Sequence, residues 1–211
     1  RTIFVVLADH GEILGEHGGF FGHGPSVYQE SVGVPLMVRY PPRVPSAARV
    51  ETPVSTLGGY ATIMDLAELE PPPTLQVASL VPLFENDGAR AGGPILAELH
   101  AAEAMAGGTI ELDDPQMKGD RRYRLLRDGD LKLVSTSMGQ DLLYDLATDP
   151  RETRDIAAER PEALREMRAR MESVRVHLDL PALDAPLAAG ADAPELDHAT
   201  RERLRALGYL D

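Results

Sequence analysis

The sequence of 211 residues contains no cysteine, and this absence removes several kinds of site at once. Disulfide bonds, cysteine–zinc sites and thiol nucleophiles are excluded for this chain. Tryptophan is also absent and aromatic residues make up only 5% of the sequence, so aliphatic side chains must fill most of any core. Because 43% of the residues are hydrophobic, the chain has enough apolar surface to build that core and is not expected to be disordered.

Positive charge is scarce as well. The chain has 21 Lys and Arg residues against 34 Asp and Glu residues, which gives a formal net charge of -13. We therefore expect no nucleic acid as a partner and no attraction to anionic membrane surfaces. No apolar run approaches the ~18 residues that a membrane-spanning helix needs. A periplasmic or secreted location and a cytoplasmic one both stay open, as does the oligomeric state.

The first part of the sequence predicts an α/β fold. The run Ile3–Leu7 is apolar and rich in β-branched residues, which is typical of a strand buried on both faces of a parallel sheet. We expect further neighbours of this strand upstream of Arg1. A second apolar run covers Val34–Arg39, and the pattern over residues 57–69 predicts a helix that the following prolines end. Residues 1–93 are interpreted as part of a catalytic α/β domain.

The pattern changes after residue 93, where short strands replace the longer elements. Asp128-Gly129 is a strong hairpin signal between two of these strands and predicts a small antiparallel sheet. A helix is predicted from Pro161, with one apolar stripe along it. We assign residues 94–180 to this smaller subdomain and residues 181–211 to a linker and a C-terminal helix. The four expected strands are Pro94–His100, Tyr123–Arg127, Leu131–Ser135 and Asp141–Leu146.

A helical turn is predicted at Asp149-Pro150. Proline suits the first helical position, and Asp149 could cap the turn. Glu152 stands three residues after Asp149, which is the spacing of a capping box. We therefore expect Glu152 to bond the backbone of its own turn.

The segment with the strongest chemical signal is Asp9-His10-Gly11-Glu12, which directly follows the first strand. In open α/β sheets, ligands bind at the carboxyl ends of strands. Adjacent side chains point in opposite directions along a strand, but at its end the backbone turns, and Asp9 and His10 could then converge on one cation. Convincing additional ligands are not visible elsewhere in the chain. The alternative is that Asp9 caps the loop and His10 is a hydrogen-bonded polar residue.

Two more histidines follow in the same glycine-rich loop. His23 lies between two glycines, which permit close approach of a ligand to the backbone. Its ordinary pKa near neutrality would let it contact an anion or protonate a leaving group. The alternative is an incidental histidine in a surface loop, and that alternative is stronger for His17. Glu12 and Glu16 could support the site or simply cap the loop.

The stretch from Val5 to Pro41 resembles the second conserved region of sulfatases in the alkaline-phosphatase superfamily. The end of the chain, with Leu143-Tyr144-Asp145-Leu146 and the tail Leu204–Leu210, is similar to the C-terminal sheet and tail of that family. The resemblance implies the C-terminal part of a mainly parallel, alkaline-phosphatase-like sheet with flanking helices. The motifs that carry it are Ala8-Asp9-His10-Gly11-Glu12, Gly15-Glu16-His17-Gly18, Gly22-His23-Gly24, Tyr28-Gln29-Glu30-Ser31 and Val34-Pro35-Leu36.

The resemblance also implies a chemistry. Asp9 and His10 would be two ligands of a divalent cation, with calcium expected first and manganese, magnesium or zinc as alternatives. His23 stands where the family places a basic residue that contacts the sulfate group of a sulfate ester substrate. The family's formylglycine nucleophile arises from a Cys/Ser-x-Pro-x-Arg motif that we expect upstream, and this sequence contains no such motif. We therefore expect residues 1–211 alone to be inactive.

Two other interpretations stay open. Phosphonate monoester hydrolases and phosphodiesterases of the same superfamily share the Asp-His-Gly motif, and the sequence does not separate them firmly from sulfatases. A non-catalytic protein, either truncated or degenerate, is the alternative from a different functional class. The stretch Leu57–Thr62 also departs from the family pattern, although that departure says little about chemistry.

Overall fold

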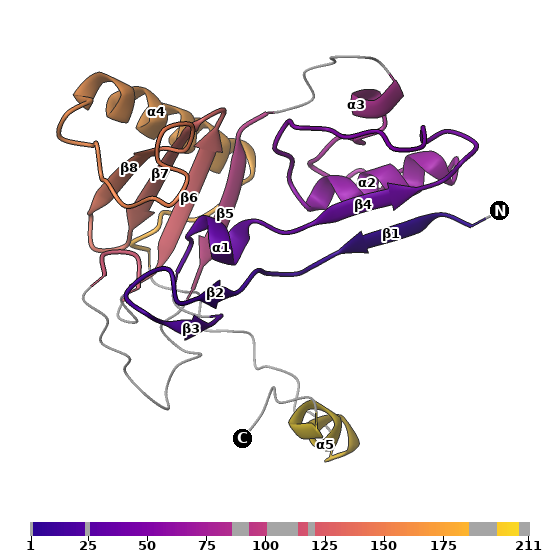
Figure 1. The fold of residues 1–211 in the computed structure, drawn as a ribbon, viewed down its shortest axis with the longest axis horizontal. Coiled ribbons are helices and arrows are strands. Elements are labelled where there is room, and N and C mark those ends of the chain that lie inside the picture. Colours follow the sequence, from indigo (N-terminus) through magenta and orange to yellow (C-terminus); the bar gives the residue numbers. More distant parts are fainter. Residues whose placement is uncertain are drawn as a thin grey trace.

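The computed structural model describes residues 2–23, 26–85, 93–100, 114–117, 121–185 and 198–206. Figure 1 shows a strand pair with a helix against it, and beside this pair an antiparallel sheet covered by a long helix. The arrangement is an α/β architecture with a small antiparallel sheet towards the C-terminus, as the sequence predicted.

The first strand, β1 (Phe4–Leu7), pairs with β4 (Leu36–Arg39) in antiparallel register, with Val5 opposite Val38. The expectation that β1 is buried on both faces is wrong for the described residues, because Phe4 is 59% exposed and Leu7 is 45% exposed. The physical reason is that β4 is the only strand that pairs with β1 in the described part of the chain.

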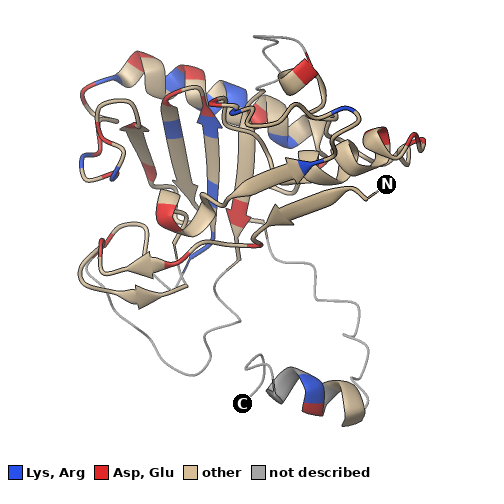
Figure 2. Ribbon diagram, turned by 45° about the vertical axis from the view of Figure 1, so that its right-hand side comes forward, with Lys and Arg blue, Asp and Glu red and all other residues tan. Residues whose placement is uncertain are grey.

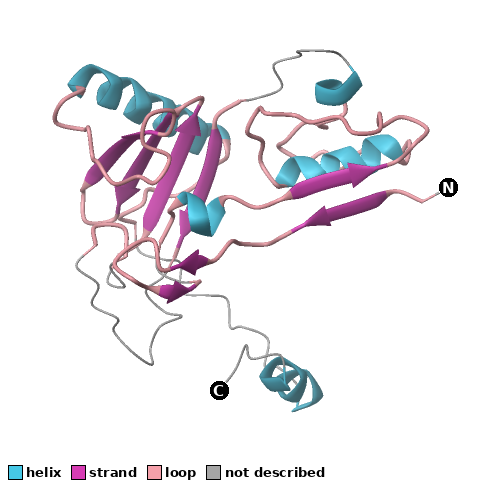
Figure 3. Ribbon diagram, viewed as in Figure 1, coloured by secondary structure: helices cyan, strands magenta, loops and turns pink. Residues whose placement is uncertain are grey.

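The predicted helix over residues 57–69 is present as α2 (Leu57–Leu66), three residues shorter than expected. Figure 3 shows it running alongside β4. Two glycines let it pack closely: a Cβ on Gly58 would lie 2.8 Å from Leu80 Cδ2, and one on Gly59 would touch side chains of the strand pair. The Thr62 hydroxyl accepts from the Leu80 amide (2.9 Å), which fixes the chain just before the short helix α3 (Pro82–Glu85).

Three short elements lie between β1 and β4. The strands β2 (Ile13–Leu14) and β3 (Phe21–Gly22) form a small hairpin, and α1 (Gln29–Val32) follows it. The side chains of the candidate site lie in the segments that flank β2 and β3.

The small antiparallel sheet is confirmed. Its order is β5 (Ile95–Leu99), β6 (Tyr123–Asp128), β7 (Leu131–Thr136) and β8 (Asp141–Asp145). The β6–β7 hairpin closes at Gly129, which has a φ of +60° that glycine adopts without strain.

The predicted helix from Pro161 is α4 (Pro161–His177), and it covers one face of the sheet (Figures 1 and 3). Its buried Met167 and Met171 pack against Leu126, Leu133 and Leu143. The opposite face of the sheet packs against Val27, at the start of the segment that leads into α1. The sheet therefore lies between α4, which packs on one face, and the candidate-site region, which packs on the other.

Charged residues of both signs are distributed along α4 (Figure 2). Some of the basic ones tie the helix to the sheet: Arg170 pairs with Asp128 of β6 at 2.8 Å, and Arg168 pairs with Asp141 of β8. The C-terminal helix is confirmed as α5 (His198–Ala206). Among the described residues, no helix has both the length and the hydropathy required to span a bilayer.

The predicted capping box at Glu152 is wrong. Asp149 does cap its turn, because its carboxylate accepts from the Arg154 amide (2.9 Å) and from the Thr153 hydroxyl (3.0 Å). Glu152 instead points into the protein, where it is 2% exposed and pairs with Lys132 of β7. Its backbone adopts a positive φ of 52°, which turns the side chain away from its own turn.

Candidate functional site

The candidate site lies where the chain leaves β1. Asp9 and His10 follow the strand directly, and both are exposed: the Asp9 side chain to 81% and the His10 side chain to 46%. The Asp9 carboxylate accepts from the His10 amide (3.0 Å) and lies 3.9 Å from the Nε2 atom of His10. The turn at the strand end therefore brings the two predicted ligand side chains to the same side of the loop.

The β2–β3 hairpin brings His23 to this place. Ile13 of β2 stands opposite Gly22 of β3, so the residue before β2 and the residue after β3 become neighbours. Those residues are Glu12 and His23, and their Oε2 and Nδ1 atoms are 3.5 Å apart. The His23 ring also stacks on the His10 ring, with centroids 4.5 Å apart and an angle of 30° between the planes.

The two sequence-predicted histidines are thus in contact, although thirteen positions separate them. Glu12, which the sequence left as a supporting residue, completes the group. The predicted glycine after His23 lies outside the described residues.

Gly11 lets the loop lie close to α1. Its amide donates to the Ser31 carbonyl oxygen (2.8 Å), and a Cβ at this position would lie 1.9 Å from the Glu30 carbonyl oxygen. No side chain fits in that space without moving the backbone. The glycine that follows Asp9 and His10 therefore has a packing reason that is independent of any ligand.

A buried polar layer lies behind the exposed histidines. The His17 ring stacks on the Tyr28 ring at 3.5 Å, nearly parallel to it, and its Nε2 atom lies 3.4 Å from the Glu30 carboxylate. The Tyr28 hydroxyl donates to the Asp114 carboxylate (2.7 Å). His17 is 8% exposed and Tyr28 is 2% exposed, so this layer is structural support rather than a surface that a ligand reaches.

The environment shifts the pKa of the Tyr28 phenol and of the Lys132 ammonium. Burial raises the pKa of the Tyr28 phenol far above its ordinary value, and the hydrogen bond to Asp114 adds to the shift. Burial lowers the pKa of the Lys132 ammonium, while the charge of Glu152 opposes that shift. Tyr28 is therefore a permanent hydrogen-bond donor at neutral pH and not a candidate base.

Asp9 and His10 each offer an atom with a free lone pair that suits a divalent ion. His10 Nδ1 donates to the Gly11 carbonyl oxygen (2.8 Å), which leaves the lone pair of Nε2 available. The only hydrogen bond that the described residues make to the Asp9 carboxylate comes from the neighbouring amide. The Asp9 carboxylate, a hard oxygen ligand, and His10 Nε2, a borderline nitrogen ligand, therefore lie side by side and exposed. Both are atom types that bind divalent cations in proteins.

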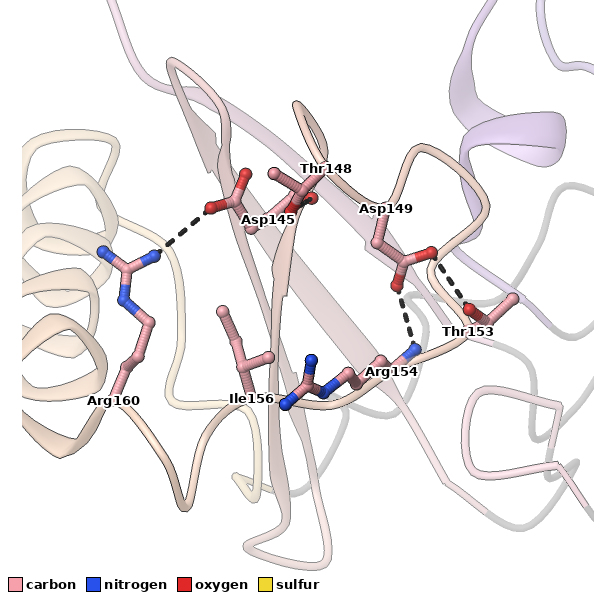
Figure 4. Close-up of a pocket in the computed structure, with 7 residues that line it drawn as sticks. All are labelled: Asp145, Thr148, Asp149, Thr153, Arg154, Ile156 and Arg160. Carbon is pink, nitrogen blue, oxygen red and sulfur yellow. Dashed lines mark hydrogen bonds and ion pairs between the residues drawn. The ribbon is translucent and has the colours of Figure 1, made fainter.

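A pocket in the described part of the chain lies away from the candidate site. It has a volume of about 420 Å³ and surrounds the turn after β8. Figure 4 shows that its polar side chains contact one another: Arg160 pairs with Asp145 at 3.3 Å, and Asp149 caps the turn. Because these groups satisfy each other, we interpret the pocket as a by-product of the turn.

The sequence did not identify Lys132 and Glu152 as partners. Lys132 stands in the apolar run Leu131–Val134 and is fully buried. A lysine in the middle of such a run was an available signal that a buried acid lies nearby. Nothing in the local sequence identifies which acid it is.

Comparison with known proteins gives the class. Residues 15–92 match the family described as N-sulphoglucosamine sulphohydrolase, C-terminal. Arylsulfatase K of Xenopus laevis is 30% identical over 193 residues, which are 88% of this chain and 33% of that protein. The chain thus spans about a third of the length of this curated relative.

Similar solved structures include a sulfatase and a related hydrolase. BT4656, solved in complex with its substrate D-glucosamine-2-N,6-O-disulfate, superposes with a TM-score of 0.72 at 26% identity, over 88% of this chain and 36% of that one. A phosphonate monoester hydrolase from Silicibacter pomeroyi superposes with a TM-score of 0.64 at 23% identity, over 86% and 36%. That second likeness concerns the fold alone.

The fold is that of the alkaline-phosphatase-like hydrolases. Within that class, the chain belongs to the sulfatase family and matches the C-terminal portion of its members.

Proposed function

We propose that the natural protein containing this chain is a sulfatase that hydrolyses sulfate esters, and that Asp9, His10 and His23 belong to its active site. The observation that carries the proposal is the contact between the His10 and His23 rings at the exit of β1, with centroids 4.5 Å apart. Two potential metal ligands, Asp9 and His10, and one further basic side chain, His23, therefore meet at one exposed place in a sulfatase-family chain.

Asp9 and His10 would hold a divalent cation. Calcium is the first candidate, and manganese, magnesium or zinc are alternatives. Their free oxygen and nitrogen atoms support this role. Such an ion would polarise a sulfuryl oxygen and help to position the nucleophile, which another part of the natural protein must supply.

His23 would contact the sulfate group. It is 66% exposed, and Glu12 can accept from its Nδ1 at 3.5 Å, which leaves Nε2 available for a substrate oxygen. A donor in that position stabilises negative charge that develops in the transition state, or passes its proton to the leaving oxygen. Glu12 then serves to orient the ring.

A phosphonate monoester hydrolase has the same fold. The second candidate activity is therefore the hydrolysis of phosphonate monoesters or phosphodiesters. The two activities differ in the atom that is attacked, sulfur or phosphorus. The preference of the enzyme for one substrate over the other therefore separates them.

The test is to express the complete natural reading frame and to measure kcat/KM for an aryl sulfate and for an aryl phosphonate monoester. We expect the sulfate to be preferred. His23→Gln should lower kcat by about 10²–10³, the usual cost of losing one transition-state donor. Asp9→Asn should raise the concentration of metal ion that activity requires.

His177→Gln is the matched control, because His177 is an exposed histidine on α4 outside the site. Preference for the phosphonate would favour the second candidate. Unchanged kcat in His23→Gln would overturn the role proposed for His23. No activity towards either substrate under any divalent ion would overturn the proposal as a whole and favour a non-catalytic protein.

A further inference from the structure

The hairpin that places His23 beside the candidate site cannot hold its own position. Its strands β2 and β3 have only two residues each, and they pair with no other strand in the described part of the chain. A two-stranded hairpin is marginally stable at best in water, so one this short has to be held by contacts with the rest of the protein. Ile13, which is fully buried, anchors β2. The second anchor is His17, in the turn between the two strands.

His17 docks the hairpin turn on the residues that lead into α1. The chain reverses immediately after it, at Gly18 and Gly19, whose φ angles of 67° and 76° favour glycine. The centroid of the His17 ring lies 3.5 Å from that of the Tyr28 ring, with 5° between the planes, and Nε2 lies 3.4 Å from the Glu30 carboxylate. His17 is 8% exposed, so the turn is buried against this segment.

Glu30 of α1 supports both segments of the candidate site. Its carboxylate faces His17 in the hairpin turn, and its carbonyl oxygen lies 1.9 Å from where a Cβ on Gly11 would stand, directly after His10. One residue therefore lies against the loop that carries His10 and against the hairpin that places His23. We propose that His17 and Glu30 are positioning residues that hold the two histidine rings of the site in contact. The inference rests on the proposed function, and it concerns two residues that the proposed chemistry does not use.

Packing alone does not account for this pair. His17 Nε2 and Glu30 Oε2 are buried, and neither makes a hydrogen bond of good geometry within the described part of the chain. A buried polar atom without a hydrogen bond costs stability, whereas a phenylalanine would stack on Tyr28 without that cost. An imidazole and a carboxylate that face each other do, however, favour one orientation of the turn over the others. The pair therefore gives the hairpin a single placement, which the position of His23 requires and stability does not.

The experiment is a double-mutant cycle in the complete natural protein. Its kcat for an aryl sulfate is measured in the parent, in His17→Ala, in His23→Gln and in the double variant. We expect His17→Ala to lower kcat by about 10–10²-fold, the upper figure being the cost of misplacing a reacting group by about 1 Å. In the His23→Gln background the same substitution should change kcat by less than about twofold, because His17 acts only through His23. Glu30→Ala should show the same pattern. Should His17→Ala fail to fold, His17→Gln takes its place, since it also removes the stacked ring but keeps a polar group beside Glu30.

Met171→Ala is the matched control, because Met171 is buried under α4 on the opposite face of the sheet. It should lower stability through the cavity that it leaves, and it should leave kcat unchanged. Equal losses of kcat from His17→Ala in both backgrounds would overturn the inference, because they would assign His17 to overall stability alone. That result would leave the sulfatase proposal standing.

Hydrogen exchange of the amides of residues 20–23 adds a measurement that needs no turnover. Exchange should be faster in His17→Ala than in Met171→Ala, because only the first variant releases the hairpin locally. Equal exchange rates in the two variants would overturn the inference as well. Absence of turnover, or unchanged kcat in His23→Gln, would contradict the proposed function instead, and the exchange rates would then decide whether His17 positions the hairpin.

Discussion

The ammonium group of Lys132 lies 2.6 Å from the Glu152 carboxylate, and neither side chain is exposed to solvent. Lys132 also donates to the Val27 carbonyl oxygen (2.6 Å), and the Gln29 amide donates to the second oxygen of Glu152 (2.7 Å). One buried ion pair therefore ties β7 to both sides of Tyr28, which packs beneath the candidate site. The sheet and the site loop are held together by charge as well as by apolar contact.

Lys132→Met should destabilise the protein by about 3–5 kcal/mol, because it leaves the Glu152 carboxylate buried without its cation. Urea denaturation of the 211-residue chain measures this loss. Arg165→Ala is the control, since Arg165 pairs with Glu162 on the exposed face of α4 and such pairs contribute less than about 1 kcal/mol. If Lys132→Met behaved like Arg165→Ala, Glu152 would have to be neutral or hydrated in the folded chain.

This ion pair illustrates what the sequence could and could not predict. The four-stranded sheet and α4 follow from local signals: alternating apolar residues, a glycine at a hairpin, and one apolar stripe. Glu152 also had a local explanation, as a capping residue, and it was wrong. Its actual partners are Lys132 on β7 and the Gln29 amide, 123 positions away, so no local pattern could indicate them.

The candidate site was predicted only in part, because local patterns do not indicate contacts between distant positions. Asp9, His10 and His23 stand out by residue type within a glycine-rich loop, so the sequence identified them. The position of Glu12 beside His23 depends on a hairpin of two two-residue strands, which are too short to give a periodic signal. The exposure of β1 was missed because an apolar run predicts a strand but does not indicate how many neighbours cover it.

Tyr28→Phe should change how stability depends on pH. Burial and the bond to Asp114 raise the pKa of the phenol above its unfolded value of about 10. Above that pH, the unfolded chain loses the proton while the folded chain keeps it, so stability falls as pH rises. Tyr28→Phe should cost about 1 kcal/mol at pH 7 for the lost hydrogen bond, and should show a smaller decrease above pH ~10.

Urea midpoints measured at several pH values provide the comparison. Tyr60→Phe is a suitable control, because Tyr60 is 48% exposed and its substitution should leave the alkaline slope unchanged. An alkaline slope in Tyr28→Phe equal to that of the unmodified chain would show that the Tyr28 phenol ionises freely in the folded protein.

The 211-residue chain on its own should not hydrolyse an aryl sulfate at any divalent-ion concentration. The reason is chemical: the sequence contains no cysteine and no Ser-x-Pro-x-Arg motif from which the family's nucleophile is formed. A sensitive fluorogenic assay of the purified chain is sufficient. Turnover that disappears in His10→Ala would contradict the expectation and place a complete active site within these residues.

Gly11→Ala should disrupt both the packing and the metal-binding geometry of the site loop. An added methyl group would lie 1.9 Å from the Glu30 carbonyl oxygen, so either α1 or the loop must move, and the bond from the Gly11 amide to Ser31 must stretch. We expect a loss of about 3 kcal/mol in the free energy of unfolding, at the upper end for an overpacked site. Because the His10 ring is hydrogen-bonded to the Gly11 carbonyl oxygen, the orientation of this proposed metal ligand should change in the same variant.

Gly93→Ala separates this effect from the general cost of replacing glycine. A Cβ at Gly93 would meet no atom within 4 Å, so we expect the free energy of unfolding to change by no more than about 0.5 kcal/mol. Urea denaturation is measured on both variants in parallel. Should Gly11→Ala be as stable as Gly93→Ala, the loop would not lie against α1 in solution, and the packing that places His10 beside His23 would be absent.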